Sequence, residues 1–193
     1  ARLARIIVVG YPYHVIQRGN GDRLVFETAS EYGCYLGWLK EYSTRFGVDI
    51  WAYCLMSTHV HFICVPKAED SLARAFNALH MRYAQYFNDK RSIRGQLWRA
   101  RFTSCALDAR SVREEVRFIE NNPVRWGLVE RAEEYRWSSA RCHVDGDRDP
   151  VTSGECFLTT EISDWREYLE DRGDEAVLRR TRARLKTGRP AGE

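Results

Sequence analysis

The feature that most constrains how this chain can fold is residues 51–66, a β-prone stretch with two histidines near its centre. Side chains two residues apart in a strand point to the same face, so His59 and His61 can face one side of a sheet while Val60 faces the other. Two neutral imidazoles on one face can bind one divalent metal ion. The alternative is a polar strand end with two unrelated histidines, and His-x-His is too short a motif to decide between them.

The segments around these histidines predict an α+β fold. Four strands are expected, over 13–18, over 48–56, along the histidine stretch to Pro66, and within 98–107. Two helices are expected between them, at 30–46 and 71–88. Gly47 should end the first helix, and Asp70 or Ser71 should cap the second. The order β-α-β-β-α-β predicts a ferredoxin-like antiparallel sheet with two helices on one face and the histidines on an inner strand.

Beyond this sheet the chain is predicted to be largely helical. Ser111 and Glu114 have the spacing of a capping box, which predicts a helix that begins there and stops at Asn122-Pro123. Residues 143–160 are rich in Asp and Gly and are expected to form a loop, and a charged helix is expected over 164–185. We predict one domain over residues 1–141 and an extension over 142–193, made of a loop, a charged helix and a basic tail.

Composition limits the class of protein. The net charge of +3 is mild, but six cations crowd the last fifteen residues. The six cysteines include no Cys-x-x-Cys pair, which argues against a zinc site or a small disulfide scaffold. Apolar runs are too short to cross a bilayer, and the first residues lack the apolar stretch of a signal peptide. A reduced, cytoplasmic protein with no membrane partner is expected; the oligomeric state stays open, with a monomer favoured.

Basic and aromatic residues interleave in a way that is typical of contacts to single-stranded DNA. Aromatic rings stack on bases and cations neutralise phosphates, and the basic tail could follow a DNA backbone. The alternatives are an edge strand, a turn and a helix face whose polar groups are simply solvated. The candidate DNA contacts are Arg5, Arg18, Asn20, Trp98, Arg99, Arg101, Arg179, Arg180, Arg182, Arg184, Lys186 and Arg189.

Several stretches together resemble the REP-associated tyrosine transposases, which are single-tyrosine HUH transposases, HUH meaning His-hydrophobe-His. Their order and spacing carry the resemblance, because no single stretch is specific. The stretches are Tyr13-His-Val-Ile-Gln-Arg-Gly-Asn20, Trp51-Ala-Tyr-Cys-Leu-Met56, His59-Val-His61, Leu97-Trp-Arg-Ala-Arg-Phe102, Asn122-Pro-Val-Arg-Trp-Gly-Leu128, Trp137-Ser-Ser-Ala140 and Thr187-Gly-Arg-Pro190. The resemblance covers about residues 1–141 closely and the tail loosely.

The resemblance implies a site and a reaction. His59, His61 and Asn122 match the family's ligands for Mg or Mn, which would act as a Lewis acid on a DNA phosphate. The substrates that it implies are single-stranded DNA and hairpins of short palindromic repeats. A tyrosine on the helix after the sheet would attack the phosphate and leave a 5′-phosphotyrosine and a free 3′-hydroxyl.

The chain departs from the family at the nucleophile. The family places its tyrosine four residues before the asparagine, and this chain has Phe118 there. Spacing of four keeps positions 118 and 122 on one helix face, so only the hydroxyl is missing. Either the change was engineered to hold an uncleaved complex, which we favour, or the copy lost activity. Composition alone would make Phe118 an ordinary core aromatic.

Two rival functions follow. One is a non-catalytic hairpin-binding or regulatory protein that has lost the chemistry. The other is a metal-dependent hydrolase, for which Glu120 is the only acid close in sequence, although it lies about 200° around the helix from position 118. Tyr83 and Tyr86 could replace the nucleophile but have core spacing. His14, His80 and His143 are expected to be a strand, a helix-surface and a loop residue.

Overall fold

The computed structural model describes residues 7–153, 156–171, 179, 181 and 183. Five of the candidate DNA contacts in the tail, Arg180, Arg182, Arg184, Lys186 and Arg189, lie outside these residues, as does Arg5. In the described part no helix is long and apolar enough to cross a membrane. The six cysteines are all free thiols.

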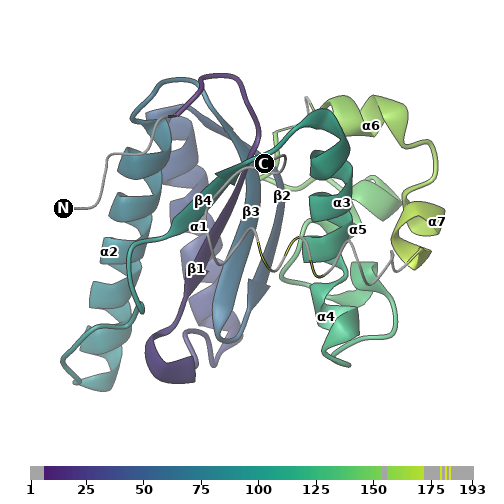
Figure 1. The fold of residues 1–193 in the computed structure, drawn as a ribbon. Coiled ribbons are helices and arrows are strands. Elements are labelled where there is room, and N and C mark those ends of the chain that lie inside the picture. The colour runs from purple at the N-terminus through teal and green to yellow at the C-terminus, as the bar shows by residue number, and fades with distance from the viewer. Residues whose placement is uncertain (1–6, 154–155, 172–178, 180, 182, 184–193) are drawn as a thin grey trace.

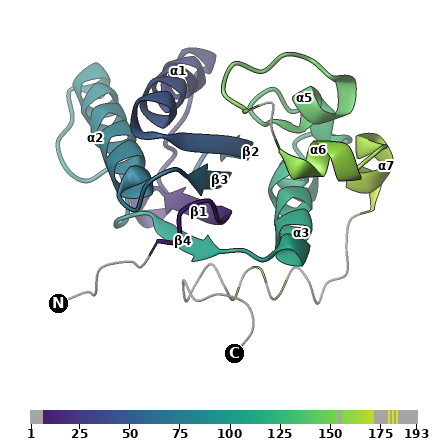
Figure 2. The same cartoon turned by 90° about the horizontal axis from the view of Figure 1, so that it is seen from above.

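A four-stranded antiparallel sheet forms the centre of the molecule (Figure 1). Its strands, in the order β2-β3-β1-β4, are β2 (Val48–Met56), β3 (His59–Pro66), β1 (Tyr13–Arg18) and β4 (Thr103–Ala106). Helices α1 (Ala29–Phe46) and α2 (Ser71–Arg91) cover one face (Figure 2). This is the predicted ferredoxin-like arrangement, and the histidine strand is an inner strand as expected.

The β2–β3 hairpin fixes which way the two histidines point. Met56 pairs with His59 across a two-residue turn, and Cys54 pairs with His61. Val60, between the histidines, is fully buried in the core that the sheet forms with α1 and α2. The histidines therefore face the opposite side of the sheet, as strand alternation predicts.

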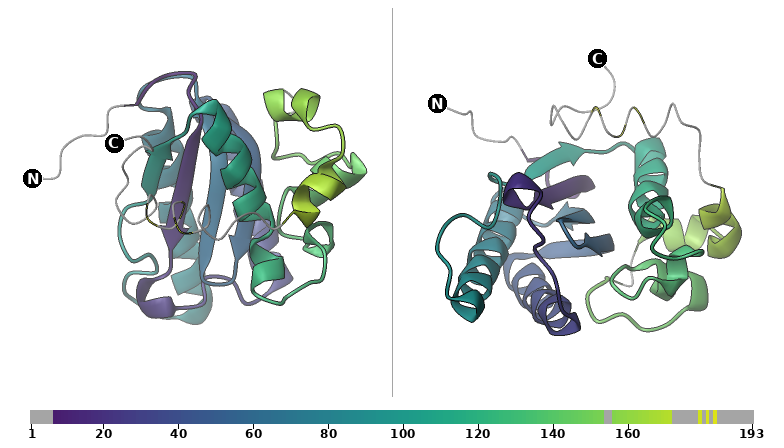
Figure 3. Two further views of the ribbon diagram at one scale, coloured as in Figure 1. Left: turned by 45° about the vertical axis from the view of Figure 1, so that its right-hand side comes forward. Right: turned by 90° about the horizontal axis from the view of Figure 1, so that it is seen from below.

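Helix α3 (Ala109–Glu120) lies on that opposite face and packs against β2 and β3 (Figures 2 and 3). Its apolar side, with Val112, Val116 and Ile119, joins Ala52 and Ile63 of the sheet in a second core cluster. The remaining helices follow on the outer side of α3: α4 (Asn122–Arg125), α5 (Ala140–Asp145), α6 (Phe157–Glu161) and α7 (Trp165–Glu170). Two short 3₁₀ turns, η1 (Asn20–Asp22) and η2 (Ala132–Glu134), complete the fold. The division at residue 141 stays a prediction, and α6 and α7 share the second cluster with α3.

Several element boundaries differ from the predicted ones. Strand β4 begins at Thr103 rather than near residue 98. Helix α3 begins at Ala109, because the Asp108 carboxylate accepts a hydrogen bond from Ser111 N–H at 2.7 Å and takes the capping role expected of Ser111. The 143–160 segment contains the end of α5 and the start of α6, so it is not a continuous loop.

Proline 123 acts differently from the prediction. Helix α3 ends at Glu120, and Pro123 stands in the first turn of the separate short helix α4, where its missing N–H removes no bond. Asn122 therefore opens α4 instead of continuing the helix of Phe118. The two positions still meet at one cavity.

Candidate functional site

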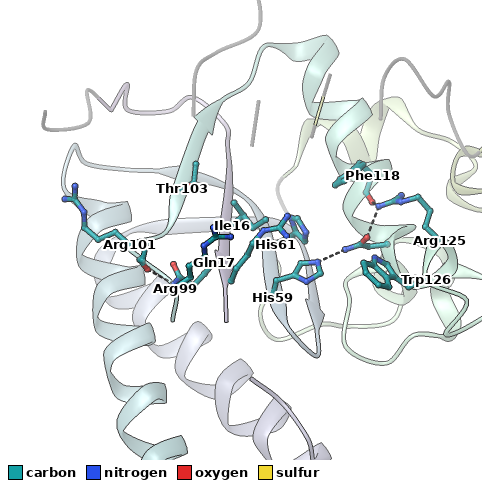
Figure 4. A pocket seen from close by; sticks show the side chains of 13 residues that line it. Ile16, Gln17, His59, His61, Arg99, Arg101, Thr103, Phe118, Arg125 and Trp126 are labelled. Carbon is teal, nitrogen blue, oxygen red and sulfur yellow. Dashed lines mark hydrogen bonds between the residues drawn. The ribbon is translucent and has the colours of Figure 1, made fainter. Parts of the chain in front are cut away.

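A cavity of about 920 Å³ opens on the α3 face of the sheet, beside the paired histidines (Figure 4). Strands β1 and β3 supply one wall, and α3 and α4 supply the other. The lining residues are Ile16, Gln17, Arg18, His59, His61, Arg99, Ala100, Arg101, Thr103, Phe118, Asn122, Arg125 and Trp126. The fold thus brings together the predicted metal ligands, the predicted nucleophile position and three of the predicted DNA contacts.

The two histidines are neutral and each is oriented by a neighbour. Their ring centroids are 5.0 Å apart. His59 Nδ1 lies 2.9 Å from Thr58 Oγ1, and its Nε2 lies 3.2 Å from Asn122 Nδ2, which donates to it. Burial, with a smaller effect of Arg18, lowers the pKa of His59 to about 4. Burial and the neighbouring His59 hold the pKa of His61 well below its usual range. Neutral imidazoles are the form that binds metal.

Behind His61 runs a buried chain of polar side chains that the sequence did not predict. His61 Nδ1 lies 2.8 Å from His14 Nε2, and His14 Nδ1 lies 2.7 Å from Glu115 Oε2. The other oxygen of Glu115 accepts from Thr181 Oγ1 at 2.9 Å. All four side chains are at most 2% exposed. A carboxylate behind a histidine fixes the tautomer and the ring position, so His14 and Glu115 are positioning residues for His61.

Phe118 occupies the cavity wall and is also part of the second core cluster. Its ring centroid lies 6.0 Å from that of His61, and only 7% of the residue is exposed. The Arg125 guanidinium lies 4.2 Å over the ring, and it donates to Phe118 O at 2.5 Å and to Asn122 Oδ1 at 3.0 Å. Arg125 therefore ties the aromatic position to the predicted third ligand.

The predicted DNA contacts divide into three groups. Arg18, Arg99 and Arg101 line the main cavity, and a neighbouring cavity of about 350 Å³ joins Arg18, Asn20 and Arg99 to His59. Arg179 is exposed near the end of the described chain. Trp98 is buried, and its Nε1 donates to His80 O at 2.9 Å, so it has little surface for stacking on a base and leaves the DNA-binding set.

The other titratable candidates lie elsewhere. His80 is buried and its Nε2 meets Tyr35 OH at 2.9 Å, so the expected surface position was wrong. Tyr83 is fully buried in the core across the sheet from the histidines, as its spacing predicted. Glu120 is buried against His143 and Ser139 and does not line the cavity. No acid among the described residues lines this cavity, so the hydrolase hypothesis gains no support from the described part of the site.

The donor types at the site fit a divalent metal. His59, His61 and Asn122 would hold it with two imidazole nitrogens and the amide oxygen, which accepts from Arg125 here while the amide NH₂ faces His59. Imidazole suits transition metals better than it suits Mg, so Mn fits this set better. Among the described residues no cluster of three or more His, Cys, Asp or Glu side chains could hold a metal, and the Asn122 amide stays the predicted third donor.

The antiparallel sheet and the histidine pair on its inner strand have the arrangement expected of the His-hydrophobe-His transposases. The chain belongs to the IS200-like transposases, because residues 7–122 match the family model described as "Transposase IS200 like". No curated protein matches it in sequence.

Among solved structures, the chain is similar to a REP-associated tyrosine transposase bound to a REP hairpin. The TM-score is 0.60 at 18% identity, over 80% of this chain and 92% of that one. A transposase candidate from Deinococcus radiodurans R1 aligns with a TM-score of 0.44 at 18% identity, over 63% of this chain and 97% of that one. The expected resemblance is confirmed for the family and the fold.

Proposed function

We propose that this chain binds hairpin DNA with a single-stranded flank and places one phosphate of the flank at the histidine pair. The observation that supports this is the convergence of Arg18, Arg99 and Arg101 on the cavity that holds His59 and His61. The structural relative is described as bound to a REP hairpin, so a palindromic hairpin is the DNA to try first. Cationic side chains at a cavity mouth attract the phosphate backbone.

With Phe118 in place, the chain binds this DNA without cutting it. In a family member with tyrosine at this position, the phenolate oxygen would attack phosphorus. A new oxygen–phosphorus bond would form, and the bond to the 3′-oxygen would break. The leaving oxygen would take up a proton, and the DNA would stay joined to the protein by its 5′-phosphate. A metal held by His59, His61 and Asn122 would supply Lewis acidity and orientation to the phosphate.

The test compares the chain as it stands with its Phe118→Tyr variant on a labelled hairpin with single-stranded flanks, with Mn or with EDTA. We expect both proteins to shift the hairpin in a native gel. Only Phe118→Tyr should form a band in a denaturing gel that is heavier by the mass of the protein, and only with Mn. Phe118→Leu is the matched control, since it also lacks a hydroxyl.

Each alternative gives a different result. A hairpin-binding protein that has lost the chemistry would form no adduct even as Phe118→Tyr, while it still bound DNA and Mn. A hydrolase would cut with Phe118 in place and leave no adduct. An adduct on the Phe118 protein would place the nucleophile elsewhere, and failure of either protein to bind the hairpin would refute the DNA-binding proposal itself.

A further inference from the structure

An exposed tryptophan forms part of the cavity wall beside the proposed ligands. Trp126 lines the cavity with His59 and Asn122, yet it is 66% exposed. No other large hydrophobic residue in the described part of the chain is more exposed. Its indole makes no hydrogen bond, ring contact or cation–π contact with the residues that the structure describes. The described part of the fold therefore gives this ring no such partner, although indole is the side chain with the largest apolar face.

The backbone under Trp126 is held firmly. Trp126 N–H donates to Asn122 O at 3.1 Å, and the next two residues close a Schellman motif at the end of α4. Gly127 adopts φ +66° and donates to Val124 O at 3.0 Å, and Leu128 N–H donates to Pro123 O at 2.9 Å. An aromatic ring with few rotatable bonds on a fixed backbone binds a flat ligand with little loss of entropy.

Positive charge lies across the cavity from this ring. Figure 4 shows Arg99 on the other side of the histidine pair from Trp126. Arg99 and Arg101 are exposed, and their guanidinium groups pair with no acidic side chain in the described part of the chain. An aromatic face on one side and cations on the other match a nucleotide chain, whose bases stack and whose phosphates are negative.

We propose that Trp126 stacks on one unpaired base of the single-stranded flank, next to the phosphate at the histidine pair. The inference rests on the proposed DNA binding and adds the state of the nucleotide, since a paired base inside a duplex does not offer its face. Every base has a π-face, so this contact selects unpaired nucleotides and tolerates different sequences.

The experiment uses the chain as it stands, because Phe118 prevents cutting and leaves binding alone to be measured. Fluorescence anisotropy would give Kd for a hairpin with flanks, for the blunt hairpin, and for a series in which one unpaired nucleotide at a time is abasic. The proteins are the parent, Trp126→Ala, Trp126→Leu, Trp126→Phe and the control Leu128→Ala. Leu128 is 54% exposed and does not line the cavity.

We expect Trp126→Ala and Trp126→Leu to weaken binding to the flanked hairpin by about 5- to 100-fold, Trp126→Phe less, and Leu128→Ala hardly at all. One abasic position should weaken the parent by a similar factor and leave Trp126→Ala unchanged, which is the signature of a direct contact. The blunt hairpin should not distinguish the proteins.

Three results would overturn the stacking contact while leaving DNA binding intact. The first is a Trp126→Ala protein that binds the flanked hairpin as tightly as the parent does. The second is a Trp126→Ala loss that is the same for every abasic oligonucleotide, so that no position is coupled to it. Equal loss on the blunt hairpin would mean a duplex contact. If the parent binds none of these DNAs, the proposed function fails, and the stacking contact fails with it.

Discussion

Replacing Glu115 by glutamine should weaken metal binding from a position that touches no metal. When neutral His14 donates Nδ1–H to the Glu115 carboxylate at 2.7 Å, its Nε2 is left as an acceptor. That nitrogen, 2.8 Å from His61 Nδ1, then accepts the Nδ1–H of His61. The lone pair of His61 therefore lies on Nε2, the nitrogen on the far side of the ring from His14. Glu115 determines which ring nitrogen of each histidine carries the proton, because a carboxylate can only accept a hydrogen bond.

Glutamine keeps the shape of Glu115 but can reverse this proton arrangement, because its amide carries a donor as well as an acceptor. If its amide NH₂ faces His14, His14 Nδ1 becomes an acceptor and Nε2 the donor, so His61 must carry its proton on Nε2 instead. If its oxygen faces His14, Thr181 Oγ1 meets a donor instead of the oxygen that now accepts from it at 2.9 Å. Changes to a residue behind a metal ligand typically weaken metal affinity about 10- to 100-fold. We expect Glu115→Gln to weaken Mn binding by this factor.

Calorimetry with Mn on the parent, Glu115→Gln and Glu114→Gln measures the effect. Glu114 is the neighbouring carboxylate, and it pairs with Arg110 at 3.5 Å. Its variant should keep Mn affinity within about twofold, because Glu114 neither lines the cavity nor hydrogen-bonds to His14. Long-range ¹H–¹⁵N spectra of the imidazoles should show the His61 proton on Nδ1 in the parent and on Nε2 in Glu115→Gln. A folded Glu115→Gln protein with parental Mn affinity and the parental His61 tautomer would refute the reasoning.

Three further predictions concern the pH dependence of stability, the binding of Mn and the salt dependence of hairpin binding. The pKa of His59 is about 4 in the folded protein and near 6.5 in the unfolded chain, so the unfolded chain takes up the proton first as the pH falls. The contribution of His59 to the free energy of unfolding is therefore complete above pH 6.5 and falls by about 3 kcal/mol between pH 6.5 and pH 4. Urea unfolding at several pH values in that range should show this loss. His59→Gln should make the free energy of unfolding depend less steeply on pH, and an equal pH dependence in both proteins would contradict the prediction. His61→Ala should lower Mn affinity far more than hairpin affinity, which calorimetry and anisotropy measure separately, and an unchanged Mn affinity would remove His61 from the site. Arg99→Ala should reduce the logarithmic salt slope of hairpin binding by about 0.7 to 0.9, the value for one phosphate, whereas an unchanged slope would exclude a phosphate contact.

Local patterns were enough to predict the sheet and the orientation of the histidine pair. Alternation along 48–66 requires one face for His59 and His61 and the other for Val60, and any hairpin with that pattern gives the same result. The first helix ends as expected at Gly47, which adopts φ +64°. These features depend on neighbours within a few residues, which is the range over which sequence patterns are informative.

Trp98 shows where such patterns stop being informative. The same alternation of basic and aromatic residues fits two structures. One is a strand with its aromatic rings exposed to DNA, and the other is a loop with an aromatic ring packed in the core. The contact with α2 decides between them, because Trp98 Nε1 donates to His80 O, eighteen residues earlier in the chain. His80 is drawn inward for a similar reason, since Tyr35 of α1 offers it a hydroxyl at 2.9 Å.

The positioning residues could not be predicted for a related reason. His14 and Glu115 are 101 residues apart, and each looks ordinary in its own segment. Their meeting depends on the register of β1 against β3, which pairs Ile16 with His61, and on the packing of α3 over that part of the sheet. A polar residue at position 14, two residues from the partner of His61 on the same strand face, was the one available signal.

The surroundings of Phe118 show that the contacts at this position do not require a tyrosine. The ring is held by apolar packing in the second core cluster and by the Arg125 guanidinium over its face, and Arg125 also holds its carbonyl and the Asn122 amide. None of these contacts needs a hydroxyl, so the positions of Asn122 and His59 do not depend on the chemistry at position 118. If the proposed function is right, binding and cutting forms of this scaffold differ by one oxygen atom, and Phe118→Tyr needs no second change. The buried Tyr83, by contrast, would have to cross the sheet to reach the same phosphate.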